Sequence, residues 1–209
     1  MIKIDKTKTY CIGDYNYKNF ATLTDEEVRL VWEWRNDARI REWMTNQEEI
    51  PFENHLRFIE SLKARIDKYY WLVYKGSMPI AVLDIIDIDY EKGETEPGYY
   101  LNPELLNSGE GLFFNYNFRN FLFNALGFQS VKGNIKVGND RAYTMSTFNG
   151  VYAVSIDNFS DGEHLIMRGV KEDFQRLSEK HLLKDFVKYV RIHQINWEEL
   201  IAQLKDKNK

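Results

Sequence analysis

The stretch Glu94–Leu126, ETEPGYYLNPELLNSGEGLFFNYNFRNFLFNAL, decides the fold that we expect for this chain. It predicts a strand, a short loop over Ser108 to Gly111, and a long helix that carries an apolar stripe and ends at Gly127. The first N–H groups of a helix have no intrahelical partners, and the helix dipole adds positive charge there. A glycine loop in front of a helix therefore predicts a ligand that bears phosphate.

The bulk composition indicates a globular protein without general affinity for polyanions. The 209 residues suffice for one substantial core or at most two small domains. A formal net charge of -4 gives no general attraction to nucleic acid or to an anionic membrane, so we expect phosphate binding to be local. The single cysteine, Cys11, excludes an internal disulfide and suits a reducing cytoplasm. The start of the chain lacks the apolar core of a signal peptide, and no run approaches the roughly 18 apolar residues of a membrane span.

The part of the chain before this stretch predicts a strand, helices and a hairpin. Residues 14–22 alternate weakly and predict the first strand. Thr24 and Glu27 form a capping box ahead of a helix, and residues 32–47 predict two short helices with a bend near Asn36-Asp37. The other expected elements here are a helix from Pro51 and two strands, 69–74 and 79–88, joined at Gly76-Ser77.

The part after the stretch completes a mixed order of strands and helices. We expect a strand at 128–137, a short helix at 139–148 and a hairpin that turns at Asp161-Gly162. This order predicts an α/β (α+β) domain with a mixed central sheet over residues 1–171. The charged tail, residues 172–209, predicts a C-terminal helical extension, which would either cap the acceptor site or pair two subunits in a homodimer.

The strand order and the glycine loop resemble the GNAT family of N-acetyltransferases, which use acetyl-CoA. The pyrophosphate loop of that family is usually Arg or Gln, two residues, Gly, one residue, then Gly or Ala. Here it reads Leu106-Asn107-Ser108-Gly109-Glu110-Gly111, with Leu106 at the basic or amide position. The Asn-x-x-Ala element of the family appears as Asn139-Asp140-Arg141-Ala142, and the strand before the loop reads Glu96-Pro97-Gly98-Tyr99-Tyr100.

Three further segments indicate one branch of that family. WEWRND (32–37), IREWMTNQEEI (40–50) and HLRFIESLK (55–63) resemble the amino-sugar acetyltransferases of pseudaminic-acid biosynthesis. The resemblance implies that the acceptor is the 4-amine of a UDP-linked 4-amino-4,6-dideoxy sugar and that the amine attacks the thioester of acetyl-CoA directly. From the charge balance we expect neither nucleic acid nor a membrane as a partner. It also implies a substrate-binding set of Arg35, Trp43, Met44, Asn46 and His55. Arginine can bind a phosphate with two N–H groups and an aromatic face can stack a sugar or uracil, whereas the alternative is a packed helix pair with Arg35 bracing a loop.

The resemblance also implies how acetyl-CoA binds. The pyrophosphate would accept from backbone N–H groups of the loop while the Glu110 side chain faces water, and the pantetheine would run beside the preceding strand. The cofactor-binding residues implied are Tyr99, Tyr100, Leu101, Ser108, Gly109, Glu110, Gly111, Leu112 and Asn139.

Glu96 is the expected general base, directly or through water, because it lies on the strand that the family uses for that role. A glutamate at its ordinary pKa of about 4.3 is a poor base unless burial raises the pKa. The alternative for Glu96 is a carboxylate paired with a basic residue. His55 is the second candidate base, since imidazole titrates near neutrality, or else a substrate contact or a structural histidine. His164, His181 and His193 lack the spacing of metal ligands, so we expect no metal site.

The sequence offers two candidates for the donor of a proton to the CoA thiolate. Ser146 stands where relatives have tyrosine, and the serine hydroxyl is a much weaker acid than the phenol of tyrosine. Tyr143 lies three residues earlier on the same helical face and could substitute, with core packing as its alternative. Leu106 and Ser146 also support a CoA-binding protein that has lost catalysis. The other alternative function is a protein N-terminal acetyltransferase of the ribosomal-protein type.

Overall fold

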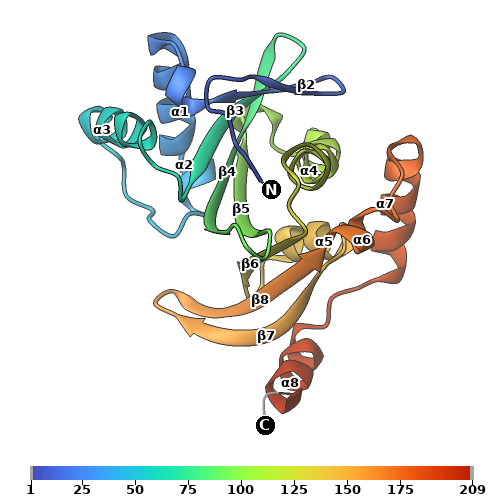
Figure 1. Cartoon of the computed structure of the whole chain (residues 1–209). Coiled ribbons are helices and arrows are strands. Elements are labelled where there is room, and N and C mark those ends of the chain that lie inside the picture. The colour runs from blue at the N-terminus through green and yellow to red at the C-terminus, as the bar shows by residue number, and fades with distance from the viewer. Residues whose placement is uncertain (1, 208–209) are drawn as a thin grey trace. The chain divides into compact units, whose positions relative to one another are not determined.

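The chain folds around a mixed sheet of eight strands, and the computed structural model describes residues 2–207 of it (Figure 1). The strand order is β1-β2-β3-β4-β5-β6-β8-β7. Strands β5 and β6 pair in parallel, whereas β1–β2, β2–β3, β3–β4, β6–β8 and β7–β8 are antiparallel. The strands are β1 (Tyr10–Ile12), β2 (Tyr15–Asn19), β3 (Tyr69–Lys75), β4 (Met78–Asp89), β5 (Glu94–Leu101), β6 (Ser130–Lys136), β7 (Val151–Phe159) and β8 (Gly162–Val170). The mixed α/β class predicted from the sequence is confirmed.

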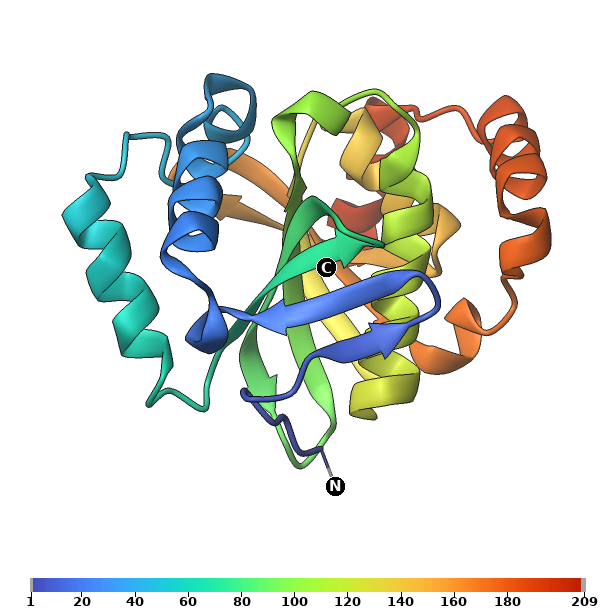
Figure 2. The same cartoon turned by 90° about the horizontal axis from the view of Figure 1, so that it is seen from above.

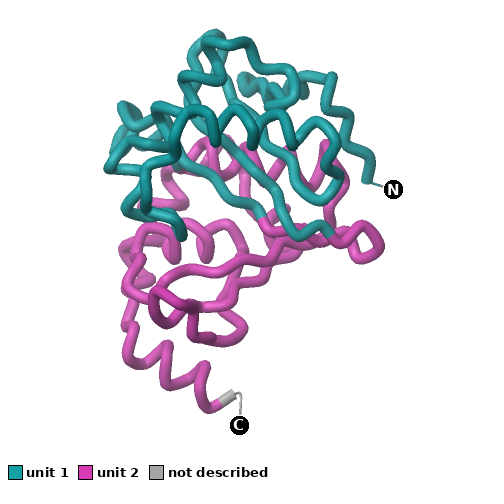
Figure 3. Tube along the Cα trace, turned by 90° about the vertical axis from the view of Figure 1, so that its left-hand side faces the viewer, with its two compact units in different colours: residues 1–88, 97–111 teal, residues 89–96, 112–209 magenta. Residues whose placement is uncertain are grey.

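The chain divides into two compact units, residues 1–88 with 97–111 and residues 89–96 with 112–209 (Figure 3). The boundary predicted at residue 171 is a different division and stays a prediction. The α-helices are α1 (Asp25–Asn36), α2 (Ala38–Arg41), α3 (Phe52–Leu62), α4 (Glu110–Asn120), α5 (Asp140–Phe148), α6 (Lys171–Phe174), α7 (Leu182–Ile192) and α8 (Trp197–Lys207). No helix within residues 2–207 combines the length and apolar character that a bilayer crossing requires.

The first unit packs α1 and α3 on one face of strands β3 and β4, and the two helices lie side by side (Figure 2). The predicted capping box starts α1: Glu27 N–H donates to Thr24 Oγ1 at 3.3 Å and Thr24 N–H donates to Glu27 Oε2 at 2.6 Å. Apolar residues at helical and strand spacing then form one core. Its buried members are Phe20, Val28, Val31, Trp34, Ile59, Leu62, Leu72 and Val82.

The second unit has a core between helices that are far apart in the sequence. Leu112 of α4, Phe148 of α5 and Leu182 of α7 are buried together. Phe186 and Tyr189 of α7 pack against Phe148 with ring centroids 5.1 and 5.5 Å apart. The predicted C-terminal helices therefore share a core with α4 and α5.

The structure differs from the predicted elements mainly near the N-terminus. A strand was predicted over 14–22, but β2 ends at Asn19, whose side chain accepts from Ala21 N–H and starts a 3₁₀ turn. Strand β1, which pairs with β2, was not predicted because three residues show no alternation. Pro51 caps α3 instead of occupying its first position. The predicted stop at Gly127 is confirmed, since Gly127 has φ 88° and follows a π-helical segment, Phe121–Leu126.

Candidate active site

The glycine loop connects β5 to α4 within the first unit, and its two glycines are needed for different reasons. Gly109 has φ 88°, which strains any L side chain, although a Cβ there would meet open space. A Cβ at Gly111 would lie 3.3 Å from Leu101 Cδ1, so this position requires a close approach between the start of α4 and β5. Asn107 also has a positive φ, 66°. The loop thus has the backbone shape that the sequence predicted for an anion site.

Glu110, between the two glycines, is held by side chains of the first unit. Its carboxylate accepts from Lys75 Nζ at 2.8 Å and from Tyr15 Oη–H at 2.8 Å, and its side chain is only 15% exposed. The expectation that this side chain faces water is therefore wrong, because the β2–β3 pair brings Tyr15 opposite Lys75. The consequence is that Lys75 compensates the one negative charge of the loop.

Ser108 organises the loop internally. Its hydroxyl donates to the Leu105 carbonyl at 2.7 Å and accepts from Glu110 N–H at 3.1 Å, and its own N–H donates to Leu105 O at 3.2 Å. The side chain of Leu112 is buried in the core of the second unit. Any contact of Leu112 with a cosubstrate would therefore come from its backbone N–H.

The residues of β5 before the loop alternate between the two faces of the sheet. Tyr100 packs on the core of the first unit and donates to Val31 O at 3.5 Å, and burial raises its pKa. Tyr99 is 36% exposed, and Leu101 touches the Gly111 position. A Cβ at Gly98 would lie 2.9 Å from Asp84 Oδ2, which explains the glycine of the Glu-x-Gly-x-Tyr pattern.

Glu96, the predicted base, lies in the second unit, where β5 pairs with β6. The register joins Glu94 with Ser130 and Thr95 with Val131 just before it. Asn134 Nδ2 of β6 donates to Glu96 Oε1 at 3.3 Å, and a Cβ at Gly133 would lie 3.8 Å from Glu96 Cγ. A carboxylate oxygen can accept both this hydrogen bond and a proton, which is the chemistry that a general base requires.

The predicted residues of α5 also lie in the second unit. Asn139 caps this helix by accepting from Ala142 N–H at 3.1 Å. Tyr143 packs on Trp197 of α8, with ring centroids 5.4 Å apart, and lines a cavity of about 330 Å³ between α5, α7 and α8. Burial, followed by the nearby Tyr189, raises the pKa of Tyr143. This packing supports the structural alternative for Tyr143, and the donor roles of Tyr143 and Ser146 stay predictions.

The predicted acceptor residues lie in the first unit, around the end of α1. Arg35 Nη2 donates to Asn46 O at 2.8 Å, as in the alternative where Arg35 braces a loop. Its Nη1 is buried without a hydrogen-bond partner among the described residues, and burial lowers the pKa of the guanidinium. Trp43 is 64% exposed and donates to Glu42 Oε1 at 2.9 Å, and Met44 N–H donates to Arg41 O at 3.0 Å.

His55 lies in the core between α1 and α3. It is 5% exposed, and burial lowers its pKa to about 4, so the ring is neutral near neutral pH. Its Nε2 is buried with no hydrogen-bond partner in the described chain. A neutral ring with this pKa is a weak base, and its position supports the structural interpretation over the catalytic one.

Sequence patterns did not find the partners that hold the site residues. Lys75 and Tyr15 reach Glu110 through the β2–β3 register, and Asn134 reaches Glu96 from the neighbouring strand. Each partner is 35 or more residues distant in sequence from the side chain that it contacts. The correct pairing register of the strands would have predicted these contacts, because it brings each partner close to the side chain that it contacts.

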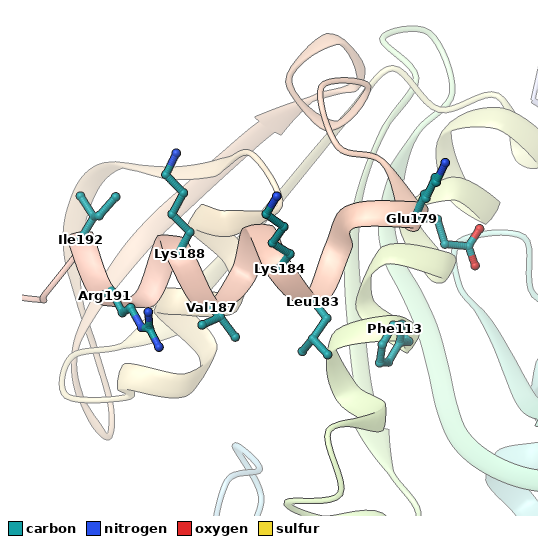
Figure 4. Close-up of a pocket in the computed structure, with 9 residues that line it drawn as sticks. Phe113, Glu179, Leu183, Lys184, Val187, Lys188, Arg191 and Ile192 are labelled. Carbon is teal, nitrogen blue, oxygen red and sulfur yellow. The ribbon is translucent and has the colours of Figure 1, made fainter.

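A groove of about 730 Å³ runs along α7 (Figure 4). Leu183 and Val187, with exposed fractions of 58% and 41%, line it beside Lys184, Lys188 and Arg191. None of the predicted site residues lines this groove, but Phe113 of α4 does. The groove is therefore formed by α4 together with α7, one of the C-terminal helices.

Comparisons with known proteins identify the class of enzyme. No family model matches the chain. It is 33% identical to the acetyltransferase PseH of Campylobacter jejuni over 125 residues, which are 60% of this chain and 76% of that protein. The crystal structure of C. jejuni N-acetyltransferase PseH with acetyl coenzyme A covers 75% of this chain and 99% of its own, with a TM-score of 0.58 and 24% identity. A spermidine N-acetyltransferase of Vibrio cholerae, solved with CoA and spermine, matches with a TM-score of 0.68 and 14% identity over 78% of this chain and 98% of its own.

The fold and the glycine loop define an N-acetyltransferase of the GNAT class. The resemblance stated from the sequence is confirmed. With one third of positions identical over three quarters of the relative, the chain belongs to the PseH family of acetyltransferases. The cosubstrate expected from the sequence, acetyl-CoA, is the ligand of the C. jejuni structure.

Proposed function

We propose that this protein transfers the acetyl group of acetyl-CoA to the amino group of a nucleotide-linked amino sugar. The observation that carries the proposal is the identity of 33% with PseH, together with the three N-terminal segments that resemble the amino-sugar branch. Those segments lie at the end of α1, from the end of α2 into the loop that follows it, and in α3, all within the first unit, where the predicted acceptor residues also lie. The cytoplasm, where acetyl-CoA and nucleotide sugars are both available, is the proposed compartment.

The loop supports the donor half of the reaction. Gly109 supplies a left-handed backbone position and Gly111 a close approach, so the loop can present backbone N–H groups at the start of α4 to a diphosphate. Lys75 compensates the Glu110 carboxylate at 2.8 Å, which removes a repulsion that a diphosphate would otherwise meet. Bound acetyl-CoA supplies an activated thioester.

The chemistry that we propose uses Glu96 as the proton acceptor. The ammonium of the sugar loses a proton to Glu96, directly or through water, and the free amine attacks the thioester carbonyl carbon. The new C–N bond forms, the C–S bond breaks, and the CoA thiolate leaves and takes a proton from a donor that the sequence assigns to Ser146 or Tyr143. The nitrogen gives up its second proton as the amide forms, and that proton restores the donor. The products are the acetamido sugar, the CoA thiol and one proton, which Glu96 holds and then releases to water.

Arg35 supports recognition of an anionic acceptor. Its guanidinium is partly buried, one nitrogen is fixed on Asn46 O, and the buried Nη1 has no hydrogen-bond partner among residues 2–207. A buried unpaired donor costs free energy, and a substrate phosphate or carboxylate would relieve that cost. The exposed Trp43 is the aromatic face that we assign to the sugar or uracil.

A thiol-release assay with acetyl-CoA and a panel of amines tests the proposal. The panel contains a UDP-linked 4-amino-4,6-dideoxy sugar, the free amino sugar, spermidine and peptides with free N-termini. We expect turnover with the nucleotide sugar at a kcat/KM at least about a hundredfold above that for every other amine, since an unpaired buried donor discriminates strongly. Preference for the peptides would support the ribosomal-protein-type alternative, and binding of CoA without turnover of any amine would support the catalytically inactive one.

A further inference from the structure

A continuous chain of hydrogen bonds extends from Glu96 into the β6–β8 sheet of the second unit. Asn134 Nδ2 donates to Glu96 Oε1 at 3.3 Å, and Asn134 Oδ1 lies 2.7 Å from His164 Nδ1. His164 Nε2 lies 2.9 Å from Asp161 Oδ1, and Lys136 Nζ is 3.3 Å from Asp161 Oδ2. The register explains the arrangement: His164 lies opposite Lys136, and Asn134 is two residues away on the same face of β6.

The chemistry of the partners fixes where the hydrogens lie. A carboxylate only accepts, so Asn134 must turn its NH₂ group toward Glu96 and its carbonyl oxygen toward His164. His164 Nδ1 must then donate to that oxygen, and Nε2 lies 2.9 Å from Asp161 Oδ1 on the other side of the ring. His164 is 9% exposed and stacks on Phe159 with ring centroids 4.5 Å apart, which holds the ring in this orientation.

We propose that Asn134 and His164 are positioning residues for Glu96 in the acetyl transfer, an inference that rests on the proposed function. Asn134 holds Glu96 Oε1 and so helps to orient the carboxylate that receives the proton of the attacking amine. His164 and Asp161 prevent the amide of Asn134 from rotating, because rotation would place its carbonyl oxygen against the carboxylate. The proton moves from the ammonium to the Glu96 carboxylate and stops there, and no proton passes along the chain.

A core-packing role does not explain this chain of contacts. Asn134 is exposed, so burial does not force its amide to find partners. Other charged groups lie near the chain: Lys132 and Arg168 are 4.0 and 3.2 Å from Glu94 Oε1, and Asp157 lies opposite His164 on β7. Asn134 is the residue that joins the catalytic carboxylate to the histidine.

Kinetics of the full chain test the proposal. We expect Asn134→Ala to lower kcat about tenfold and to change the KM for acetyl-CoA by less than about twofold, since the amide acts on the base and not on the cosubstrate. The acidic limb of the kcat/KM profile should move to higher pH, because the charged form of the base loses a donor. His164→Leu should give the same signature, and His164→Gln, which keeps an N–H donor, should recover part of kcat. Asn158→Ala, an exposed asparagine of the same sheet, is the matched control.

A wild-type kcat and pH profile in Asn134→Ala would overturn the proposal, as would a loss that Asn158→Ala shares. If the wild-type protein acetylates a different amine, the proposed acceptor is wrong. The same kinetic comparison, made with that amine, then still tests the positioning role. If no amine is turned over, NMR provides the test. We expect both Glu96→Ala and His164→Leu to shift the side-chain amide signals of Asn134, because each exchange removes a partner of that amide. Unchanged amide signals in both variants would refute the positioning role without any activity measurement.

Discussion

Replacing Lys75 by methionine should weaken the binding of acetyl-CoA through the glycine loop. Lys75 Nζ lies 2.8 and 3.0 Å from the two Glu110 oxygens, and the side chains are 35% and 15% exposed. A buried charge-assisted hydrogen bond contributes about 1.5–3 kcal/mol. Because Lys75 is partly exposed to solvent, we take about 1.4 kcal/mol for the interaction between Lys75 and Glu110. Without Lys75 the uncompensated carboxylate would repel the diphosphate, so the Kd for acetyl-CoA should rise about tenfold.

Isothermal titration with acetyl-CoA measures this effect, and a double-mutant cycle isolates it. Glu110→Gln removes the charge that Lys75 compensates, while Tyr15 can still donate to the side-chain carbonyl. The double variant Lys75→Met with Glu110→Gln should therefore bind acetyl-CoA within about threefold of wild type, with a coupling free energy of about 1 kcal/mol. Equal Kd values for wild type and Lys75→Met would refute the reasoning, and so would a double variant as weak as Lys75→Met.

Three further predictions follow from individual residues. Glu96→Gln should lower kcat by at least about tenfold and leave the Kd for acetyl-CoA nearly unchanged in titration, and wild-type rates across the pH range would remove Glu96 from the mechanism. Gly109→Val should raise the KM for acetyl-CoA by about tenfold or more, because φ 88° strains a β-branched residue, whereas Gly76→Val, also strained with open space around it, is the control outside the loop. For His55 the folded pKa of about 4 lies below its unfolded value of 6.5, so the unfolded state binds more protons. Stability is then complete above the unfolded pKa and falls as pH drops toward 4, with a slope of up to about 1.4 kcal/mol per pH unit. Urea unfolding of wild type and His55→Phe measures it, and equal slopes would contradict the assignment.

Local sequence patterns predicted the parts of the fold whose causes are local. The Thr24–Glu27 capping box, the turn at Gly76-Ser77 and the helix stop at Gly127 each depend on a few adjacent residues, and the structure contains all three. Strand β1 was missed because its three residues are held by pairing with β2 and not by a pattern of their own.

The site residues also differ in how well the sequence predicts them. The glycine loop and the adjacent strand β5 could be predicted because their motif lies in one continuous stretch of sequence. The environment of Glu110 could not, because it depends on the pairing of Tyr15 with Lys75 across two strands. The buried state of His55 depends on the packing of α3 against α1, which helical spacing alone does not specify.

His55 and His164 both lie in environments that the sequence did not predict. His55 was a candidate base, and the structure buries it with its pKa lowered to about 4. His164 was assigned no role, and the structure places it 2.7 Å from the amide that holds Glu96. Neither outcome follows from residue type, because burial and hydrogen-bond partners decide what a histidine can do.

The most direct test of the proposed function is the identity of the acetylated product. The protein is incubated with acetyl-CoA and an equimolar mixture of a UDP-linked 4-amino-4,6-dideoxy sugar, spermidine and a peptide with a free N-terminus, and the products are separated and analysed by mass spectrometry and NMR. The proposal predicts that the nucleotide sugar gains one acetyl group on its amine while the competitors stay unmodified. Acetylation of the peptide or of spermidine with an unmodified nucleotide sugar would contradict it.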